Sequence, residues 1–307
     1  MKDKIKIVEV GPRDGLQNEK KIVPTDVKLL FIDKLIDAGL KNIEATSFVS
    51  PKWVPQLADN DLIMSALLAN PTYEPIQFSA LVPNLQGLTR AIQHSTKHIA
   101  IFTAASETFN QKNIHCSIKE SFERFTEMLP LIQEKQIQLR GYVSCALGCP
   151  YEGKINPKAV LETTQKLFSL GCKEVSIGDT IGVGTPKQAY DLFSLLKKEV
   201  PVEKLALHFH DTYGQALANI YAVLELGVRT IDSSTAGLGG CPYAQGASGN
   251  VSTEDVIYLL NGLGYATGVD LDKLIDAGLF ITDYLGILSH SKVALAKQGK
   301  IKKAKHE

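Results

Sequence analysis

Short runs rich in β-branched residues alternate with longer segments whose apolar residues recur every three or four positions. The longer segments predict amphipathic helices, such as residues 27–38, which close at Gly39. Pairs such as Asn156-Pro157 and Thr185-Pro186 mark helix starts. The short runs predict eight strands: Ile5–Val10, Asn42–Phe48, Ile76–Val82, His98–Thr103, Gln138–Ser144, Glu174–Asp179, Leu205–His210 and Thr230–Ser234.

Eight strand–helix units in about 265 residues match the number and length of a (β/α)8 barrel. The alternative is a doubly wound open sheet, which usually carries a glycine-rich fingerprint after its first strand. Here the first turn reads GPRDG over residues 11–15, which is no dinucleotide fingerprint. We therefore predict an α/β fold, a (β/α)8 TIM barrel with extra C-terminal helices.

No linker-like change of composition divides the chain, so we expect one TIM-barrel domain over residues 1–307. The barrel takes up about residues 5–264, and a C-terminal helical extension about residues 265–298. Two helical stretches are predicted in the extension, Leu271–Phe280 and Asp283–Leu295. The charged tail from Gly299 is expected to fray.

Charge and composition exclude several classes of protein. Lys plus Arg and Asp plus Glu both number 33, so the net charge of zero argues against a dedicated binder of nucleic acid or of anionic membranes. The chain has no run of 18 apolar residues, the length that a membrane-spanning helix needs. No signal-peptide core precedes the first strand. We expect a cytoplasmic enzyme. Five cysteines are too few for a disulfide framework.

Polar side chains gather where the predicted strands end, which is where barrels carry their active sites. Because charged residues are costly to bury inside β-rich runs, such a concentration indicates a site. The residues are Arg13 and Asp14 after the first strand, Glu44, Thr46 and Ser47 in the second, Ser144 and Cys145 after the fifth, Asp179 and Thr180 after the sixth, His208 and His210 in the seventh, and Ser233, Ser234 and Thr235 after the eighth.

His208 and His210 give the sharpest local signal. Residues i and i+2 of a strand point to the same face, so both imidazoles can meet one ion. The alternative is a pair of structural histidines. Asp14, Asp211 and Asn250 could add oxygen ligands, a set that suits Mg²⁺ or Mn²⁺, with Zn²⁺ or Co²⁺ as substitutes.

Several of these residues have a structural alternative. Asn250 precedes a helical segment, and on local grounds a helix cap is the favoured interpretation. Asp179 could likewise cap the turn before Thr185. Glu44 inside a strand needs a partner, and Arg13 at the end of the neighbouring strand is the natural one.

The glycine-rich loop from Gly237 to Gly249 carries no charge and holds Cys241. Such loops close over active sites in barrels, although a plain connection is the alternative. A lone cysteine there is a candidate acid, base or nucleophile. Cys145 and Cys149 are too few for a structural zinc site, and we interpret them as packing residues.

Five motifs carry a resemblance to a known family. Residues 8–19, VEVGPRDGLQNE, resemble the N-terminal signature of 3-hydroxy-3-methylglutaryl-CoA lyase, and residues 237–244, GLGGCPYA, resemble its catalytic cysteine loop. TSFVSPK at 46–52, YVSC at 142–145 and LHFHD at 207–211 agree with the same family. The resemblance runs from about residue 5 to 296.

The resemblance implies cleavage of 3-hydroxy-3-methylglutaryl-CoA to acetyl-CoA and acetoacetate, with an acyl-CoA thioester as the substrate. It implies that Asp14, His208, His210 and Asn250 hold a divalent ion, Mg²⁺ or Mn²⁺. It assigns catalysis to Arg13, Asp179 and Cys241, the orientation of Arg13 to Glu44, and a place at the site to Gln17. We also expect a homodimer, and no nucleic-acid or membrane partner.

The chemistry of the residues agrees with these roles. Arg13 stays charged and suits an enolate oxygen, and Cys241 could protonate the enolate carbon. The base that takes the hydroxyl proton is either Asp179 or His208. Two rival functions are a Claisen-type condensing acyltransferase, related to isopropylmalate and homocitrate synthases, and a non-catalytic CoA-binding barrel.

Overall fold

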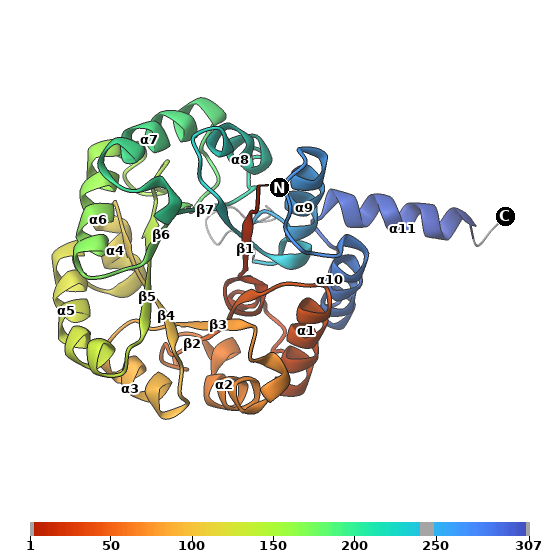
Figure 1. The fold of residues 1–307 in the computed structure, drawn as a ribbon, viewed down its shortest axis with the longest axis horizontal. Coiled ribbons are helices and arrows are strands. Elements are labelled where there is room, and N and C mark those ends of the chain that lie inside the picture. The colour runs from red at the N-terminus through yellow and green to blue at the C-terminus, as the bar shows by residue number, and fades with distance from the viewer. Residues whose placement is uncertain (1–2, 240–248, 305–307) are drawn as a thin grey trace.

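Eight parallel strands form a closed barrel at the centre of the molecule, surrounded by helices (Figure 1). The structure is a computed structural model that describes residues 3–239 and 249–304. The strands are β1 Lys6–Glu9, β2 Asn42–Ser47, β3 Gln77–Leu81, β4 His98–Ala104, β5 Gln138–Ser144, β6 Glu174–Asp179, β7 Leu205–Phe209 and β8 Thr230–Ser233. β8 pairs with β1, with Ile231 opposite Ile7, which confirms the predicted barrel and rules out the open sheet.

Each predicted strand lies within one residue of an observed one at both ends. The helices are α1 Thr25–Asp37, α2 Asn60–Ala69, α3 Leu85–Gln93, α4 Glu107–Ile114, α5 Ile118–Glu134, α6 Pro157–Ser169, α7 Pro186–Glu199, α8 Ala216–Leu224, α9 Thr253–Gly262, α10 Leu271–Leu285 and α11 Lys292–Ala304. Short helical turns are η1 Gly11–Gly15, η2 Pro55–Leu57, η3 Pro71–Tyr73, η4 Val202–Lys204 and η5 Thr235–Gly237.

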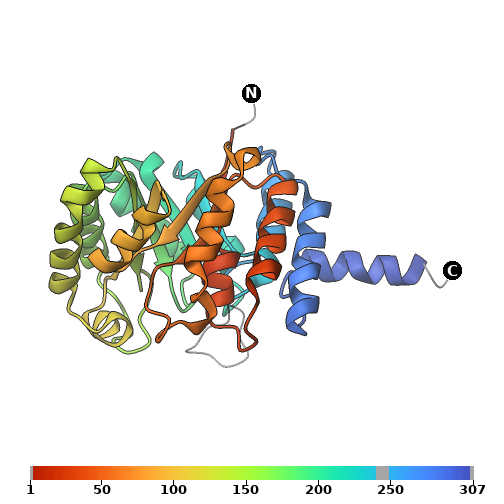
Figure 2. The same cartoon turned by 90° about the horizontal axis from the view of Figure 1, so that it is seen from below.

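The extension differs from its prediction in where the helices break. α10 continues through the expected gap after Phe280, because Ile281 and Leu285 keep burying its apolar face. It ends instead at Gly286, which takes the left-handed conformation (φ 75°) that favours glycine. The tail expected to fray from Gly299 is helical as far as Ala304, and α11 projects beyond the ring of helices (Figures 1 and 2).

The helices cover the outer face of the barrel with their apolar sides. α7 shows the pattern: it buries Ala189, Leu192, Phe193 and Leu196, positions three or four residues apart. Its Phe193 ring meets Phe209 of β7 edge to face at 6.1 Å. The main apolar core therefore lies between the strands and the helical ring, not inside the barrel.

The inside of the barrel holds charged residues. Arg140 of β5 donates to Glu174 of β6 at 2.8 Å and to Asp232 of β8 at 2.7 Å, and Lys6 of β1 pairs with the same Glu174. Barrel interiors are more often filled by branched apolar side chains. In this barrel a chain of ion pairs leads instead toward the carboxyl ends of the strands.

Four cysteines, Cys116, Cys145, Cys149 and Cys172, are free and buried. Cys145 and Cys149 pack with Ala104 and Phe109, so the packing interpretation of this pair is confirmed. Among the described helices, none is long and apolar enough to cross a membrane.

Candidate active site

The turn after β1 places Arg13 and Asp14. Residues 11–15 form a single π-helical turn in which the amides of Asp14 and Gly15 donate to the Val10 carbonyl at 2.7 and 3.1 Å. A Cβ atom at Gly15 would lie 2.6 Å from the Ser234 hydroxyl oxygen, so only glycine allows this turn to pack against the end of β8. π-helical turns are often found at functional sites.

Arg13 is held by two carboxylates. Its Nε donates to Glu44 of β2 and its Nη1 to Asp14, while Tyr142 donates to the other Glu44 oxygen at 3.0 Å. Glu44 is wholly buried, and the register of β2 against β3 shifts directly after it, a bulge of the kind that aims side chains beside active sites. The structure thus joins the predicted pair, Arg13 and Glu44.

Charge around Arg13 outweighs the effect of its burial. Burial alone would lower the pKa of the guanidinium, but Asp14 and Glu44 raise it, so Arg13 stays charged. For Asp14, burial would raise the pKa, yet Arg13, followed by His208 and His210, holds it well below its usual value. Asp14 is therefore an ionised carboxylate beside two imidazoles.

Asp14, His208 and His210 form a candidate metal centre. Their ligand atoms lie within 4.8 Å of one another. His210 Nδ1 is buried and has no hydrogen-bond partner among the described residues. Burial, and then His208, lower the pKa of His210 to about 4, so its imidazole is neutral near pH 7 and can donate a lone pair. One carboxylate and two imidazoles suit a divalent cation.

Asn250 lies beside this candidate centre and does not cap a helix. Its side-chain amide donates to Asp14 Oδ2 at 2.7 Å and to the Leu238 carbonyl at 3.3 Å. The cap of α9 is Ser252, whose hydroxyl accepts from the Asp255 amide. The local preference for a cap was wrong, because the partner of Asn250 lies 236 residues away in the chain.

The Asp179 carbonyl accepts from the His210 amide at 3.2 Å, but the Asp179 side chain turns to its own loop. Its carboxylate accepts from the amides of Val183 at 3.2 Å and Gly184 at 2.8 Å, in its own β6–α7 loop. Burial raises its pKa to about 6. The structure thus shows the turn-capping alternative, and the neighbours Gly178 and Thr180, not Asp179, line the cavity described next.

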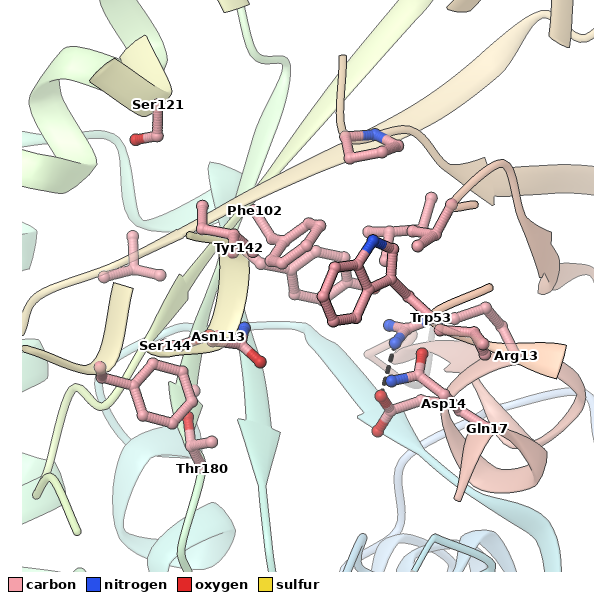
Figure 3. A pocket seen from close by; sticks show the side chains of 18 of the residues that line it. Arg13, Asp14, Gln17, Trp53, Phe102, Asn113, Ser121, Tyr142, Ser144 and Thr180 are labelled. Atoms are coloured by element: carbon pink, nitrogen blue, oxygen red, sulfur yellow. Dashed lines mark hydrogen bonds and ion pairs between the residues drawn. The ribbon is translucent and has the colours of Figure 1, made fainter. Parts of the chain in front are cut away.

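A cavity of about 640 Å³ opens at the carboxyl ends of the strands, next to the metal candidates. Figure 3 shows Arg13, Asp14 and Gln17 together on one wall, with Tyr142 and Phe102 at the centre. Trp53, 69% exposed, stands at the rim against the His115 ring, with ring centres 4.9 Å apart. The volume lies within the usual range of ligand sites.

Cys241 lies outside the described residues. Gly239, two positions before it, lines the cavity. A Cβ atom there would come within 2.8 Å of the Asn250 amide nitrogen, so the described end of the loop lies close against the metal candidates.

Sequence reasoning missed Tyr142, Arg140 and Asp232. Tyr142 contacts Glu44, and Asp232 contacts both Arg140 and His208. Arg140 and Tyr142 alternate along β5, as do Thr230 and Asp232 along β8. Because residues i and i+2 of a strand point to the same face, this spacing could have predicted that these polar side chains point into the barrel together.

Comparisons with known proteins agree with this geometry. The HMGL-like family model matches residues 4–281. A relative from Bos taurus named hydroxymethylglutaryl-CoA lyase, mitochondrial, is 58% identical to this chain. The match spans 95% of this chain and 89% of the relative. The relative of that name from Homo sapiens is 57% identical, with the same shares covered.

Solved structures agree as well. The crystal structure of hydroxymethylglutaryl-CoA lyase from Pseudomonas aeruginosa has a TM-score of 0.94 and 51% identity, over 98% of this chain and 99% of that one. An HMG-CoA lyase from Acinetobacter baumannii, solved with coenzyme A and 3-methylmalate, has a TM-score of 0.90 and 37% identity, over 96% and 95% of the two chains.

The relatives contradict the cytoplasmic location expected from the sequence. The bovine and human relatives are both named mitochondrial, whereas one relative from Rattus norvegicus, 55% identical, is named cytoplasmic. A targeting segment selects the compartment, so the composition of the barrel carries no information about it.

The family assignment rests on coverage and on identity together. The family model spans most of the chain, and relatives above 50% identity cover nearly all of it. The closed barrel is the fold that the sequence predicted. The chain therefore belongs to the hydroxymethylglutaryl-CoA lyase family.

Proposed function

We propose that this protein is a metal-dependent lyase that cleaves 3-hydroxy-3-methylglutaryl-CoA to acetyl-CoA and acetoacetate. The observation that carries the proposal is the cluster of Arg13, Asp14, His208 and His210 at one cavity, in a chain of this family. The A. baumannii relative, solved with coenzyme A, supports an acyl-CoA substrate.

The reaction breaks the bond between C2 and C3 of the acyl chain. The C3 hydroxyl loses its proton and becomes the ketone of acetoacetate, while the bonding electrons pass to C2 and form the enolate of acetyl-CoA. A proton added at C2 completes the product. The site must therefore take one proton, stabilise an enolate oxygen and return one proton.

Arg13 is the group that fits the enolate oxygen. Glu44 and Asp14 take up its Nε and Nη1, which fixes the plane of the guanidinium and leaves Nη2 for the substrate. Tyr142 completes the support by donating to Glu44. A donor held in place before the reaction stabilises developing charge without reorganising.

Asp14, His208, His210 and Asn250 would hold the divalent cation, with Mg²⁺ or Mn²⁺ as the candidates. When bound, such an ion acts as a Lewis acid that makes the C3 hydroxyl more acidic. The open nitrogen of His210 and the ionised Asp14 support this assignment. Cys241 remains our candidate for the proton returned to C2.

The contacts of Asp179 bear on which residue, Asp179 or His208, takes the proton of the C3 hydroxyl. Its carboxylate is turned to its own loop, whereas His208 lines the cavity. His208 cannot hold the cation and accept the proton at the same nitrogen. His208→Gln separates the two roles: lost Mn²⁺ affinity marks a ligand, whereas retained affinity with lost turnover marks the base.

Turnover of 3-hydroxy-3-methylglutaryl-CoA with added Mg²⁺ or Mn²⁺ tests the function. We expect acetyl-CoA to appear without any acceptor, as a coupled citrate synthase assay detects. Consumption of acetyl-CoA in the presence of a 2-oxo acid would indicate the condensing acyltransferase instead. Binding of CoA without turnover of any 3-hydroxyacyl-CoA would indicate a non-catalytic barrel.

We also propose a homodimer. Tyr258 of α9, Leu288 between α10 and α11, and Leu295 of α11 are large apolar side chains with exposed fractions of 64%, 82% and 40%. α9 and α11 contact each other at the side of the molecule from which α11 projects (Figure 1). Light scattering after size exclusion should give twice the mass of one chain, and a single-chain mass would contradict the dimer.

A further inference from the structure

The imidazole of His208 lies between two carboxylates. Its Nδ1 is 3.2 Å from Asp232 Oδ2, and its Nε2 is 3.7 Å from Asp14 Oδ2. Tyr142 packs against the ring nearly edge to face, with ring centres 5.7 Å apart. One nitrogen therefore points to the barrel interior and the other toward the candidate metal centre.

Asp232 is itself rigidly held. Its side chain is wholly buried, and Arg140 donates to both of its oxygens, at 2.7 and 3.1 Å. Ser176 donates to Oδ2 at 2.7 Å. Because both oxygens accept from one guanidinium, the geometry is that of an ionised carboxylate paired with arginine.

An ionised carboxylate can only accept hydrogen bonds. The His208 nitrogen that faces Asp232 must therefore carry the hydrogen, and in a neutral imidazole the lone pair then lies on the other nitrogen. We propose that Asp232, fixed by Arg140, is a positioning residue that holds His208 as the Nδ1–H tautomer and keeps Nε2 open to the divalent ion. The inference rests on the metal-dependent function proposed above.

Asp232→Asn separates this role from a purely structural ion pair. Because the guanidinium of Arg140 can only donate, it should draw the amide oxygen toward itself. The amide NH₂ then faces His208 Nδ1 and the Ser176 hydroxyl, which can accept. In that arrangement Nδ1 becomes the acceptor and Nε2 carries the hydrogen. A structural ion pair would have no effect on the tautomer.

Two measurements on the intact chain test the proposal. Long-range ¹H–¹⁵N spectra report the tautomer, with His208→Gln identifying the signal among the seven histidines. We expect Nδ1–H in the wild type and Nε2–H in Asp232→Asn. Titration with Mn²⁺, followed by electron paramagnetic resonance, should show affinity about 10- to 100-fold weaker in Asp232→Asn.

Ser176→Ala is the matched control. It removes a donor to the same oxygen of Asp232 without contacting His208, so the tautomer should be unchanged and Mn²⁺ affinity close to that of the wild type. Nε2–H in the wild type, or unchanged tautomer and affinity in Asp232→Asn, would overturn the proposal. The wild-type spectrum needs only His208→Gln for its assignment, so it decides even where Asp232→Asn does not fold. A wild type that shows Nδ1–H but binds no Mn²⁺ refutes the metal-dependent function and leaves the positioning of His208 supported.

Discussion

At the scale of single residues, Arg13 shows how several contacts define one functional group. Its guanidinium reaches Glu44 and Asp14 at the same time, which a single ammonium cannot do in the same geometry. Arg13→Lys should therefore lower kcat by about 10²-fold or more with little change in KM, the usual cost of losing an oxyanion donor. Steady-state kinetics measure both constants.

Arg90→Lys is the control for this substitution, because Arg90 pairs with Asp61 on the outer helices. It should keep kcat near the wild-type value. A rise in KM at unchanged kcat in Arg13→Lys would mean that Arg13 only binds the substrate.

His210 offers a test of the metal centre. Its buried Nδ1 lacks a partner among the described residues, so His210→Ala should abolish Mn²⁺ binding and metal-dependent turnover while circular dichroism stays unchanged. His98→Ala, at the start of β4, is a control on another strand. Unchanged activation by Mn²⁺ in His210→Ala would remove His210 from the ligands.

Cys241 lies outside the described residues, and its prediction rests on chemistry. A thiol with a pKa of about 8.5 is mostly protonated at neutral pH, as a proton donor must be. The hydroxyl of serine is a far weaker acid than the thiol of cysteine. Cys241→Ser should keep metal and substrate binding and lose most turnover. Cys172→Ala, in the core, should retain turnover. Near wild-type turnover in Cys241→Ser would exclude the thiol as the proton donor.

The sequence predicted residues whose signal is local. Arg13 with Asp14, and His208 with His210, stand in short motifs at strand ends. Asp232 and Asn250 depend on partners 92 and 236 residues away, Arg140 and Asp14, so nearby residues could not reveal their contacts. For Asp179, its position at a strand end predicted chemistry, and the structure adds a contact that the sequence left open, the bond from the Gly184 amide to its carboxylate.

At the scale of elements, the hydrophobic periodicity of the sequence predicted the strands and most helices. It did not predict the turns, bulges and helix breaks between them. The π-helical turn η1 and the bulge of β2 arise from contacts between neighbouring strands. The break between α10 and α11 depends on which residues the core buries. Patterns in one segment do not contain this information.

Glu254 joins α9 to the turn η5, and its titration should affect stability. The wholly buried carboxyl accepts from the Ala236 amide at 2.9 Å. Burial raises its pKa from 4.5 to about 8. Between these values the folded protein binds more protons than the unfolded chain, so the free energy of unfolding falls as pH rises, by on the order of 3–5 kcal/mol.

Glu254→Gln removes this group while leaving an acceptor for Ala236. Urea unfolding from pH 5 to pH 8 should show a weaker decline in stability than the wild type. Glu123→Gln, exposed on α5, should keep the wild-type slope. Parallel curves for Glu254→Gln and the wild type would show that Glu254 is ionised in the folded protein.

At the scale of the whole molecule, pairing of the strands around the full ring holds the barrel closed, so we expect the fold to survive removal of the ion. Removal of divalent ions with EDTA should abolish turnover and leave the far-ultraviolet spectrum unchanged. Mn²⁺ at about 100 times its Kd should add about 2.7 kcal/mol and raise Tm by about 5 °C. His210→Ala should show no such rise, and an equal rise would place the ion elsewhere.

We propose that residues 1–307 form a single folding unit, including the extension. The Ile5 amide donates to the Ala266 carbonyl, and the Ala266 amide donates to the Asp3 carbonyl, both at 3.0 Å. The Asp270 amide donates to the Ala38 carbonyl at 2.8 Å. These contacts tie the start of the extension to β1 and to the end of α1. Calorimetry should therefore record one transition, and two resolved transitions would separate the extension from the barrel.

The ion pairs inside the barrel also constrain how the chain can assemble. Lys6, in the first strand, finds its partner Glu174 in the sixth, and Arg140 in the fifth reaches Asp232 in the eighth. Until the last strand arrives, Arg140, Glu174 and Asp232 face water, and a half-barrel that buried them would leave Arg140 and Asp232 without each other at high cost. Gene halves expressed separately should thus be insoluble alone, and closure of the ring is the step at which this interior becomes stable.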